Sequence, residues 1–313
     1  MAERVLLTGA GGFVGKALGE RFVDAGYAVR AVSRQPQTLA GTFAEVAALP
    51  EEPASEAAWV PLLTGVDHVV HCAGIAHATA EIPRETYMSV NADLAGALAR
   101  AAATEIRGRF VFVSSIRAMA GPVSDTVLED DTPPAPQDDY GRSKLEGERL
   151  VAKAFAGGGF YTILRPVLIY GPGVKGNLAS LARLAALPIP LPIAGLSAKR
   201  SLLDVGALAD AILHLLGLKR PATGPFIACD CEPISVAEIV AAMRKGLGRR
   251  PLLFAFPDAL LAAPFRLAGR GEAWRRLTGP LMARADGLEA LGWKPGEDTA
   301  ERIARYAART QRG

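Results

Sequence analysis

The chain has 313 residues, of which half are apolar and 21% are charged, so it can build a large core and is not a disordered or fibrous chain. Its 35 Lys and Arg residues against 32 Asp and Glu give a net charge of +3, which is too small for a protein that binds nucleic acid through its phosphates. Three cysteines are too few for a disulfide framework, and neither a secretory signal nor an apolar run of about 18 residues is apparent, so we expect a cytoplasmic protein.

Short apolar runs alternate with alanine-rich stretches of helical length through the first 165 residues. The runs rich in Val and Phe predict buried parallel strands, and the stretches with apolar residues at i, i+3 and i+4 predict helices. The predicted strands are 4–8, 28–33, 67–72, 109–114 and 160–165, with a weaker one at 42–49. The predicted helices are 13–25, 84–103 and 140–156. This alternation predicts an α/β fold with a doubly wound parallel sheet, the Rossmann type.

The pattern changes after residue 165. Pro and Gly recur in 171–176 and 188–192, and shorter elements with a basic helical tail follow. We therefore expect a Rossmann domain over residues 1–168 and a smaller C-terminal domain over 169–313, with some later strands and helices returning to the first domain. Residues 240–313 contain 14 basic and 7 acidic residues, so this part could face an anionic substrate or a membrane, or be a solvated helical face.

A glycine-rich segment, TGAGGFVG, follows the first predicted strand and opens the first predicted helix. Gly9 permits a tight turn, Gly11 or Gly12 lets backbone N–H groups approach a pyrophosphate, and Gly15 lets helix and strand pack closely. The commoner G-x-G-x-x-G pattern would place its third glycine at Val14. The strand, turn and helix together predict a dinucleotide site with the anion at the helix N-terminus. The predicted contacts in this turn are Gly9, Gly11, Gly12, Phe13, Val14 and Gly15.

The end of the second predicted strand bears on the choice of dinucleotide. A fold of this type that prefers NAD carries an acidic residue there for the ribose 2′-hydroxyl, but this chain has Ser33 and Arg34. A hydroxyl and a guanidinium suit a 2′-phosphate. We therefore favour NADP(H), with NAD(H) as the alternative, in which case Arg34 stacks on the adenine or is solvated.

Three polar residues are candidates for the chemistry. Tyr140 and Lys144 are four residues apart on a predicted helix, so they share one face, and a nearby ammonium lowers the pKa of a tyrosine toward the working range. Ser114 and Ser115 end a predicted strand at the sheet edge where ligands of open α/β folds bind. A serine hydroxyl there can polarise a carbonyl, or it can satisfy backbone groups at the strand end.

Four segments together resemble the extended short-chain dehydrogenase/reductase family, the NAD-dependent epimerases and dehydratases, over almost the whole chain. They are the glycine turn, FVFVSS ending at residue 115, YGRSK over 140–144 and RPVLIYGPG over 165–173. The resemblance implies that Ser115 bonds the reacting oxygen, Tyr140 is the acid/base and Lys144 holds the nicotinamide ribose. If the motif of the family aligns one residue earlier, Ser114 instead of Ser115 would bond the reacting oxygen. Further cofactor contacts implied by the resemblance are Cys72, Ala73, Gly74, Asn91, Val113 and Pro166.

The segment KRSLLDV over 199–205 resembles the nucleotide-sugar branch of this family. The resemblance implies a UDP-sugar substrate, with Arg200 on its diphosphate and Asn177 in the substrate loop. Dehydratases of the branch carry an Asp-Glu pair after the catalytic hydroxyl, whereas Ile116 and Arg117 follow Ser115 here, so dehydration is disfavoured.

We favour a UDP-4-keto-6-deoxy-N-acetylhexosamine 4-reductase of surface-polysaccharide synthesis that uses NADPH. The alternative is a UDP-sugar 4-epimerase with bound NAD. A binding module without chemistry is a third reading, against which the intact Ser115, Tyr140 and Lys144 argue.

The remaining predictions concern partners and metals. We expect no metal site, because Cys229 and Cys231 have too few His or Cys residues near them in the sequence. Residues 257–277 mix Leu, Phe and Ala with four arginines, which is typical of a membrane-surface helix or of a lid over the substrate. We therefore consider peripheral membrane association, and we expect a homodimer.

Overall fold

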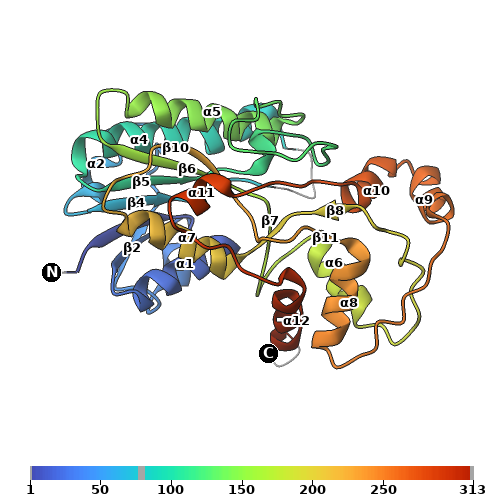
Figure 1. Cartoon of the computed structure of the whole chain (residues 1–313). Coiled ribbons are helices and arrows are strands. Elements are labelled where there is room, and N and C mark those ends of the chain that lie inside the picture. Colours follow the sequence, from blue (N-terminus) through green and yellow to red (C-terminus); the bar gives the residue numbers. More distant parts are fainter. Residues whose placement is uncertain (1, 77–81, 311–313) are drawn as a thin grey trace.

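The computed structural model describes residues 2–76 and 82–310, and its largest element is a parallel sheet of seven strands (Figure 1). The strand order is β10-β6-β5-β4-β1-β2-β3, and all neighbours are parallel. The strands are β1 (Arg4–Thr8), β2 (Ala28–Ser33), β3 (Glu45–Ala48), β4 (His68–His71), β5 (Arg109–Val113), β6 (Phe160–Pro166) and β10 (Gly224–Ala228). The predicted doubly wound sheet is confirmed, including the weak strand within 42–49.

Helices cover both faces of this sheet, as Figure 1 shows with α4 and α5 on one side and α1 and α7 on the other. Alternate residues of a strand point to opposite faces, so Val5 and Leu7 of β1 join one core and Leu6 joins the other. The first core includes α1 (Phe13–Asp24), α7 (Val205–Gly217) and α11 (Asp286–Ala290). The second core includes α2 (Val60–Leu63), α4 (Leu94–Glu105) and α5 (Asp139–Ala154). Short 3₁₀ turns are η1 (Pro36–Leu39) and η3 (Ile116–Ala118).

The stretch predicted as one helix over 84–103 is divided. Helix α3 (Arg84–Met88) leads into a π-helical turn, η2 (Ser89–Asp93), and α4 follows. Asn91 lies in this turn, fully buried, and its side chain bonds the backbone of residue 75, which follows β4. Such turns inside helices frequently occur at functional sites. The widened turn therefore places Asn91 against the edge of the sheet where β4 ends.

The C-terminal part of the chain builds a third core. Its helices are α6 (Asn177–Ala185), α8 (Val236–Gly246) and α12 (Thr299–Thr310). Its small sheets pair β8 (Lys199–Arg200) with β11 (Ile234–Ser235), antiparallel, and β7 (Leu168–Tyr170) with β9 (Leu202–Asp204), parallel. The helices α9 (Asp258–Leu267) and α10 (Gly271–Thr278) lie at the end of the molecule farthest from the large sheet (Figure 1). Across the described residues, no helix is both long and apolar enough to cross a bilayer.

A buried guanidinium holds the outer loops of this third core together. Arg244 of α8 is 1% exposed, and its Nη2 donates to the carbonyls of Leu187 (3.0 Å) and Ile189 (2.7 Å). Its Nη1 donates to the carbonyl of Pro251 at 2.5 Å and to that of Leu252 at 3.3 Å. One side chain therefore satisfies four carbonyls from two segments that are remote in the sequence.

We expect Arg244→Met to lower the free energy of unfolding by about 3 kcal/mol, because it leaves the carbonyls of Leu187, Ile189 and Pro251 without this donor in part-buried hydrogen bonds. Urea unfolding measures this loss, and Arg220→Met, at an exposed arginine, is the matched control. Equal stability of the two variants would contradict the role assigned to Arg244.

Candidate active site

The glycine turn lies at the carboxyl end of β1, where the chain order changes from β2 on one side to β4 on the other. Gly9 has a φ of +73°, and a Cβ on it would lie 2.7 Å from the backbone nitrogen of Ala73. A Cβ on Gly15 would lie 2.1 Å from the carbonyl oxygen of Gly9, so both positions require glycine. Gly12 precedes α1 without a side-chain cap, which leaves first-turn N–H groups able to bind an anion. This cradle fits the pyrophosphate of a dinucleotide.

The end of β4 is tied to the same turn. The thiol of Cys72 donates to the carbonyl of Thr8 at 2.8 Å, and the backbone N–H of Ala73 donates to the Thr8 hydroxyl at 3.3 Å. That hydroxyl also bonds Nδ1 of His71 at 2.7 Å. Burial raises the pKa of Cys72 to about 12 and, with the nearby Lys144 ammonium, lowers the pKa of His71 to about 3. Both side chains are therefore neutral and serve to align the two loops.

Asn91 connects the loop after β4 to α5. Its Oδ1 accepts from the N–H of Ile75 at 2.8 Å, and its Nδ2 donates to the carbonyl of Ile75 (2.9 Å) and to Oγ of Ser143 (3.0 Å). Ser143 Oγ in turn donates to the carbonyl of Tyr140 at 2.8 Å. A Cβ on Gly74 would lie 2.8 Å from Asn91 Oδ1, so this glycine permits the close approach.

The structure brings Ser115 and Tyr140 together. Ser115 precedes the 3₁₀ turn after β5, and its side chain forms a hydrogen bond with the side chain of Tyr140 at the start of α5. Burial raises the pKa of Tyr140, whereas this hydrogen bond and the guanidinium of Arg117 lower it. Asp138 raises the same pKa through its negative charge. Two hydroxyls that share a hydrogen bond can pass a proton to or from a bound alcohol or ketone.

Lys144 follows Tyr140 by one helical turn and is buried. Its Nζ donates to the carbonyl of Val113 at 2.8 Å and lies 4.5 Å from the centre of the Phe112 ring. Burial lowers the pKa of Lys144 to about 8, although the Glu148 carboxylate opposes this shift. The ammonium is thus held where β5 ends, on the helix face that also carries Tyr140.

Ser114, the alternative to Ser115, faces a different partner. Its hydroxyl donates to Oε1 of Glu148 at 2.5 Å, and Glu148 forms an ion pair with Arg165, whose Nη2 lies 2.6 Å from Oε2. These three side chains are all buried. Ser114 therefore supports the packing of α5 on the sheet, and Ser115 is the serine beside Tyr140.

One charged pair beside the tyrosine was not predicted. Arg117 bonds Asp138 (Nη2 to Oδ2, 2.5 Å), and Asp138 caps α5 by accepting from the N–H of Gly141 at 2.8 Å. The N–H of Arg117 also donates to Oγ of Ser115 at 3.2 Å. The sequence showed Arg117 only as a replacement for the acidic residues of dehydratases. The feature of the sequence that could have identified Arg117 is its position two residues after Ser115, which places it within reach of the start of α5.

The remaining predicted cofactor residues surround the same sheet edge. Ser33 ends β2 with its hydroxyl 3.4 Å from a Cβ built on Gly11, and Arg34 next to it is exposed. Val113 ends β5 and accepts the Lys144 hydrogen bond, while Pro166 ends β6 and is buried. The sheet edge therefore gathers the predicted residues from β1, β2, β4, β5 and β6.

Of the two predicted substrate residues, Arg200 is buried and Asn177 is exposed at the start of α6. Nη2 of Arg200 donates to the carbonyl of Gly279 at 2.8 Å, its Nε has no partner within the described residues, and burial lowers its pKa. The segment 280–284 lies between β8 and the loop that precedes Tyr140, because Leu281 bonds Lys199 and Ser201, and Met282 accepts from the N–H of Leu128. Arg200 is therefore coupled through one segment to the loop between the two catalytic candidates.

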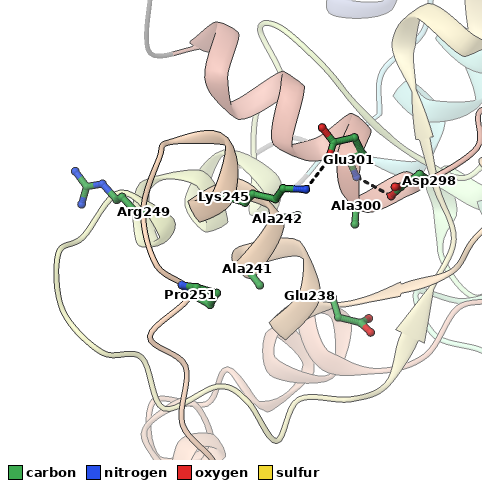
Figure 2. A pocket seen from close by; sticks show the side chains of 9 residues that line it. All are labelled: Glu238, Ala241, Ala242, Lys245, Arg249, Pro251, Asp298, Ala300 and Glu301. Atoms are coloured by element: carbon green, nitrogen blue, oxygen red, sulfur yellow. Dashed lines mark hydrogen bonds and ion pairs between the residues drawn. The ribbon is translucent and has the colours of Figure 1, made fainter.

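A separate groove lies in the C-terminal part of the chain. Figure 2 shows a groove of about 450 Å³ between α8 and α12 whose charged lining includes Glu238, Lys245 and Glu301. Lys245 and Glu301 form an ion pair at 2.7 Å across it. Because its charges are mixed and it contains none of the predicted site residues, we do not assign it a ligand. No group of three or more metal-ligating side chains occurs in residues 2–76 and 82–310.

A glycine cradle on a Rossmann sheet with a serine, a tyrosine and a lysine at its edge defines a dinucleotide-dependent enzyme of the short-chain dehydrogenase/reductase type. A model of the NAD dependent epimerase/dehydratase family matches residues 5–225. The chain therefore belongs to this family, and it is an NAD(P)-dependent enzyme.

Individual relatives cover nearly the whole chain. It is 34% identical over 310 residues to a UDP-glucose 4-epimerase from Vibrio cholerae, covering 96% of this chain and 93% of the relative. It is 29% identical over 279 residues to a ceramide reductase from Caulobacter vibrioides, covering 88% and 79%. Its fold is similar to that of MoeE5 in complex with UDP-glucose and NAD, with a TM-score of 0.75, 22% identity and 99% of each chain covered. The nucleotide-sugar branch of the family is the part that the chain resembles.

The lowered pKa of Lys144 predicts a pH-dependent cost to folding. Between pH 8 and 10.5 the unfolded chain binds the proton that folded Lys144 has lost, so stability rises with pH in this window. Relative to Lys144→Met, the wild-type protein freed of cofactor should gain up to about 3 kcal/mol of unfolding free energy across it. Urea unfolding at a series of pH values measures this difference, with Lys153→Met on the exposed face of α5 as control. A difference that stays constant with pH for Lys144→Met would contradict the burial of an ionisable amine.

Proposed function

We propose that the protein is a nucleotide-sugar 4-epimerase that acts on a UDP-hexose with NAD bound. The observation that carries this proposal is the hydrogen-bonded Ser115–Tyr140 pair, with Lys144 one turn later, beside the glycine cradle. The 34% identity to a UDP-glucose 4-epimerase over nearly the full length supports the same reaction. This reverses our preference from the sequence, which placed the 4-reductase first and the epimerase second.

The proposed cofactor contacts are those of the sheet edge. The glycine turn and the N-terminus of α1 would bind the pyrophosphate, and Lys144 would bind the nicotinamide ribose. When bound, the dinucleotide supplies oxidation and reduction at sugar C4. NAD is favoured for an epimerase, which regenerates its cofactor in each cycle, and the solved relative MoeE5 contains NAD. Exposed Arg34 in place of an acidic residue supports NADP instead, so the cofactor is to be measured directly.

The chemistry of the chain itself is proton transfer at the sugar 4-oxygen. Tyr140 as phenolate takes the proton of the 4-hydroxyl as C4 is oxidised to a ketone, and Ser115 donates a hydrogen bond to that oxygen. After the 4-keto sugar turns its other face, Tyr140 returns the proton to the oxygen as C4 is reduced. Arg117 favours the phenolate by lowering the pKa of Tyr140. The two half-reactions balance, so no net oxidant is consumed.

Arg200 and Asn177 are proposed to bind the UDP group. The Arg200 guanidinium is buried, with its Nε unpaired within the described part of the chain, and a diphosphate accepts hydrogen bonds from such a group. Burial without a carboxylate partner is costly for a cation, so an anionic ligand would offset this cost.

A reductase of a UDP-4-keto-6-deoxy sugar that consumes NADPH is the second candidate. Arg34 favours it, since a guanidinium at the end of β2 suits a 2′-phosphate. The catalytic pair serves both reactions equally. The two differ in stoichiometry, because a reductase loses one NADPH per product and an epimerase loses none.

Tyr140→Phe should lower kcat for interconversion of UDP-glucose and UDP-galactose by about 100- to 10,000-fold while leaving cofactor binding intact, because it removes only the phenolic hydroxyl that carries the transferable proton. Product analysis with added NAD or NADPH measures the reaction. Tyr161→Phe, at a partly buried tyrosine that stacks on Phe155, is the matched control. Stoichiometric loss of NADPH absorbance with a 4-keto sugar and no hexose interconversion would establish the reductase instead.

Arg117→Gln should move the acid limb of the kcat/KM profile up by about one pH unit, because the Tyr140 phenolate loses a neighbouring cation. Activity would recover at high pH, and Arg117→Lys, which retains the charge, should keep the limb in place. A fall in rate that is the same at every pH would mean that Arg117 acts only on the fold.

A further inference from the structure

The C-terminal domain exposes a concentration of large apolar side chains. Of the twelve such side chains that are exposed in residues 2–76 and 82–310, seven lie in two segments of the chain, 187–189 and 252–267. They are Leu187, Ile189, Leu252, Phe254, Phe256, Leu260 and Leu267. We call this set, together with the arginines between residues 249 and 276, the basic apolar face.

The hydrogen bonds of the backbone show that its segments are neighbours. Arg244 bonds the carbonyls of Leu187 and Ile189 and also that of Leu252. The N–H of Leu191 donates to the carbonyl of Leu252 at 2.9 Å, and the N–H of Phe254 donates to that of Leu191 at 3.0 Å. The two extended segments therefore lie side by side, fixed to α8 by a buried side chain.

Within this region most of the apolar side chains are exposed. Leu252, Phe254 and Phe256 are all exposed, while Leu253 is partly buried and packs on the third core. Leu260 and Leu267 are seven residues apart and so share one face of α9. Leu260 is 58% exposed and Leu267 is 90% exposed. Ala262 is the buried residue of α9, so most of this helix is available to a partner.

The positive charge of the region favours an anionic membrane over a second copy of this chain as the partner. Residues 249–276 contain six arginines, all exposed, and two acidic residues, Asp258 and Glu272. Glu272 is already paired with Arg276 at 3.1 Å. A second copy of the same face would bring two sets of arginines together, whereas anionic lipid headgroups would complement them.

We propose that the basic apolar face docks the protein on the surface of an anionic membrane. The leucines and phenylalanines would enter the boundary between headgroups and acyl chains, and the arginines would lie at the phosphates. In Figure 1, α9 and α10 lie at the far end from the sheet, so docking there leaves the cofactor edge uncovered. The carbonyl of Gly279, directly after α10, accepts a hydrogen bond from Arg200, so the docked face adjoins the proposed substrate subsite. This inference goes beyond the proposed function and does not depend on it.

The test is flotation of the full-length holoenzyme with vesicles of phosphatidylcholine alone or mixed with phosphatidylglycerol. We expect binding to the mixed vesicles, weakened by salt, and little binding to phosphatidylcholine alone. The double variant Leu260→Glu/Leu267→Glu should bind the mixed vesicles at least about tenfold more weakly, because it places carboxylates in the boundary region. Val23→Glu, at a side chain of α1 that is 48% exposed, is the matched control and should bind like the wild type.

Turnover of soluble UDP-hexose is measured on the same variants and should be unchanged, which separates this proposal from the proposed function. Arg266→Glu/Arg270→Glu should lower binding to the mixed vesicles without a change in turnover. Equal vesicle binding by the wild type and both double variants would overturn the proposal. It would also be overturned by a wild-type dimer that Leu260→Glu/Leu267→Glu converts to a monomer in sedimentation while no form binds vesicles.

Discussion

The buried ion pair between Glu148 and Arg165 fixes the helix that carries both candidate catalytic side chains. Each member is 4% exposed, and the hydroxyl of Ser114 adds a hydrogen bond to the three that Arg165 donates to the carboxylate. Removing two charges from water is costly, and only complete hydrogen bonding offsets that cost, so this contact tolerates one arrangement of α5 on β5 and β6. On α5, Lys144 lies one helical turn before Glu148, and Tyr140 lies two turns before it. The Glu148–Arg165 ion pair therefore determines the direction in which the side chains of Lys144 and Tyr140 point.

The parts of the fold that depend on local pattern could be predicted from the sequence. Buried parallel strands are recognised from short apolar runs, and the turn after β1 from glycines whose Cβ atoms would collide with backbone. The glycines after β1 and the serines after β5 were predicted from the position of these strand ends, whereas the residues after β4 were implied only by the resemblance to the family. The choice between Ser114 and Ser115 could not be made locally. It depends on Glu148, which lies 34 residues beyond Ser114.

Features that depend on contacts between distant residues escaped prediction. The π-helical turn at Asn91 exists because its side chain bonds the backbone of Ile75, and the sequence pattern of 84–103 is that of an ordinary helix. Arg117 looked like a substitution in a motif, yet it bonds Asp138 across 21 residues and lowers the pKa of Tyr140 through its charge. Arg244 looked like part of a basic tail and is instead buried among carbonyls up to 57 residues away. In each case a polar side chain acquires its role from a partner that no short sequence window contains.

The difference between an epimerase and a reductase is decided away from the catalytic pair. In either proposed reaction Ser115 and Tyr140 would move a proton at the sugar oxygen, so they would not determine whether the dinucleotide stays bound between turnovers. Retention of the dinucleotide would depend on which residues cover the glycine turn after β1. The ring of Phe13, at the start of α1, lies beside the glycines at 171 and 173, which follow β7. Both glycines have positive φ angles, so this loop keeps a backbone conformation that other residues rarely adopt. The contact joins the glycine turn after β1 to the loop that follows β7. A loop constrained in this way suits the proposed epimerase, which keeps its dinucleotide between turnovers, better than a reductase, which must exchange it.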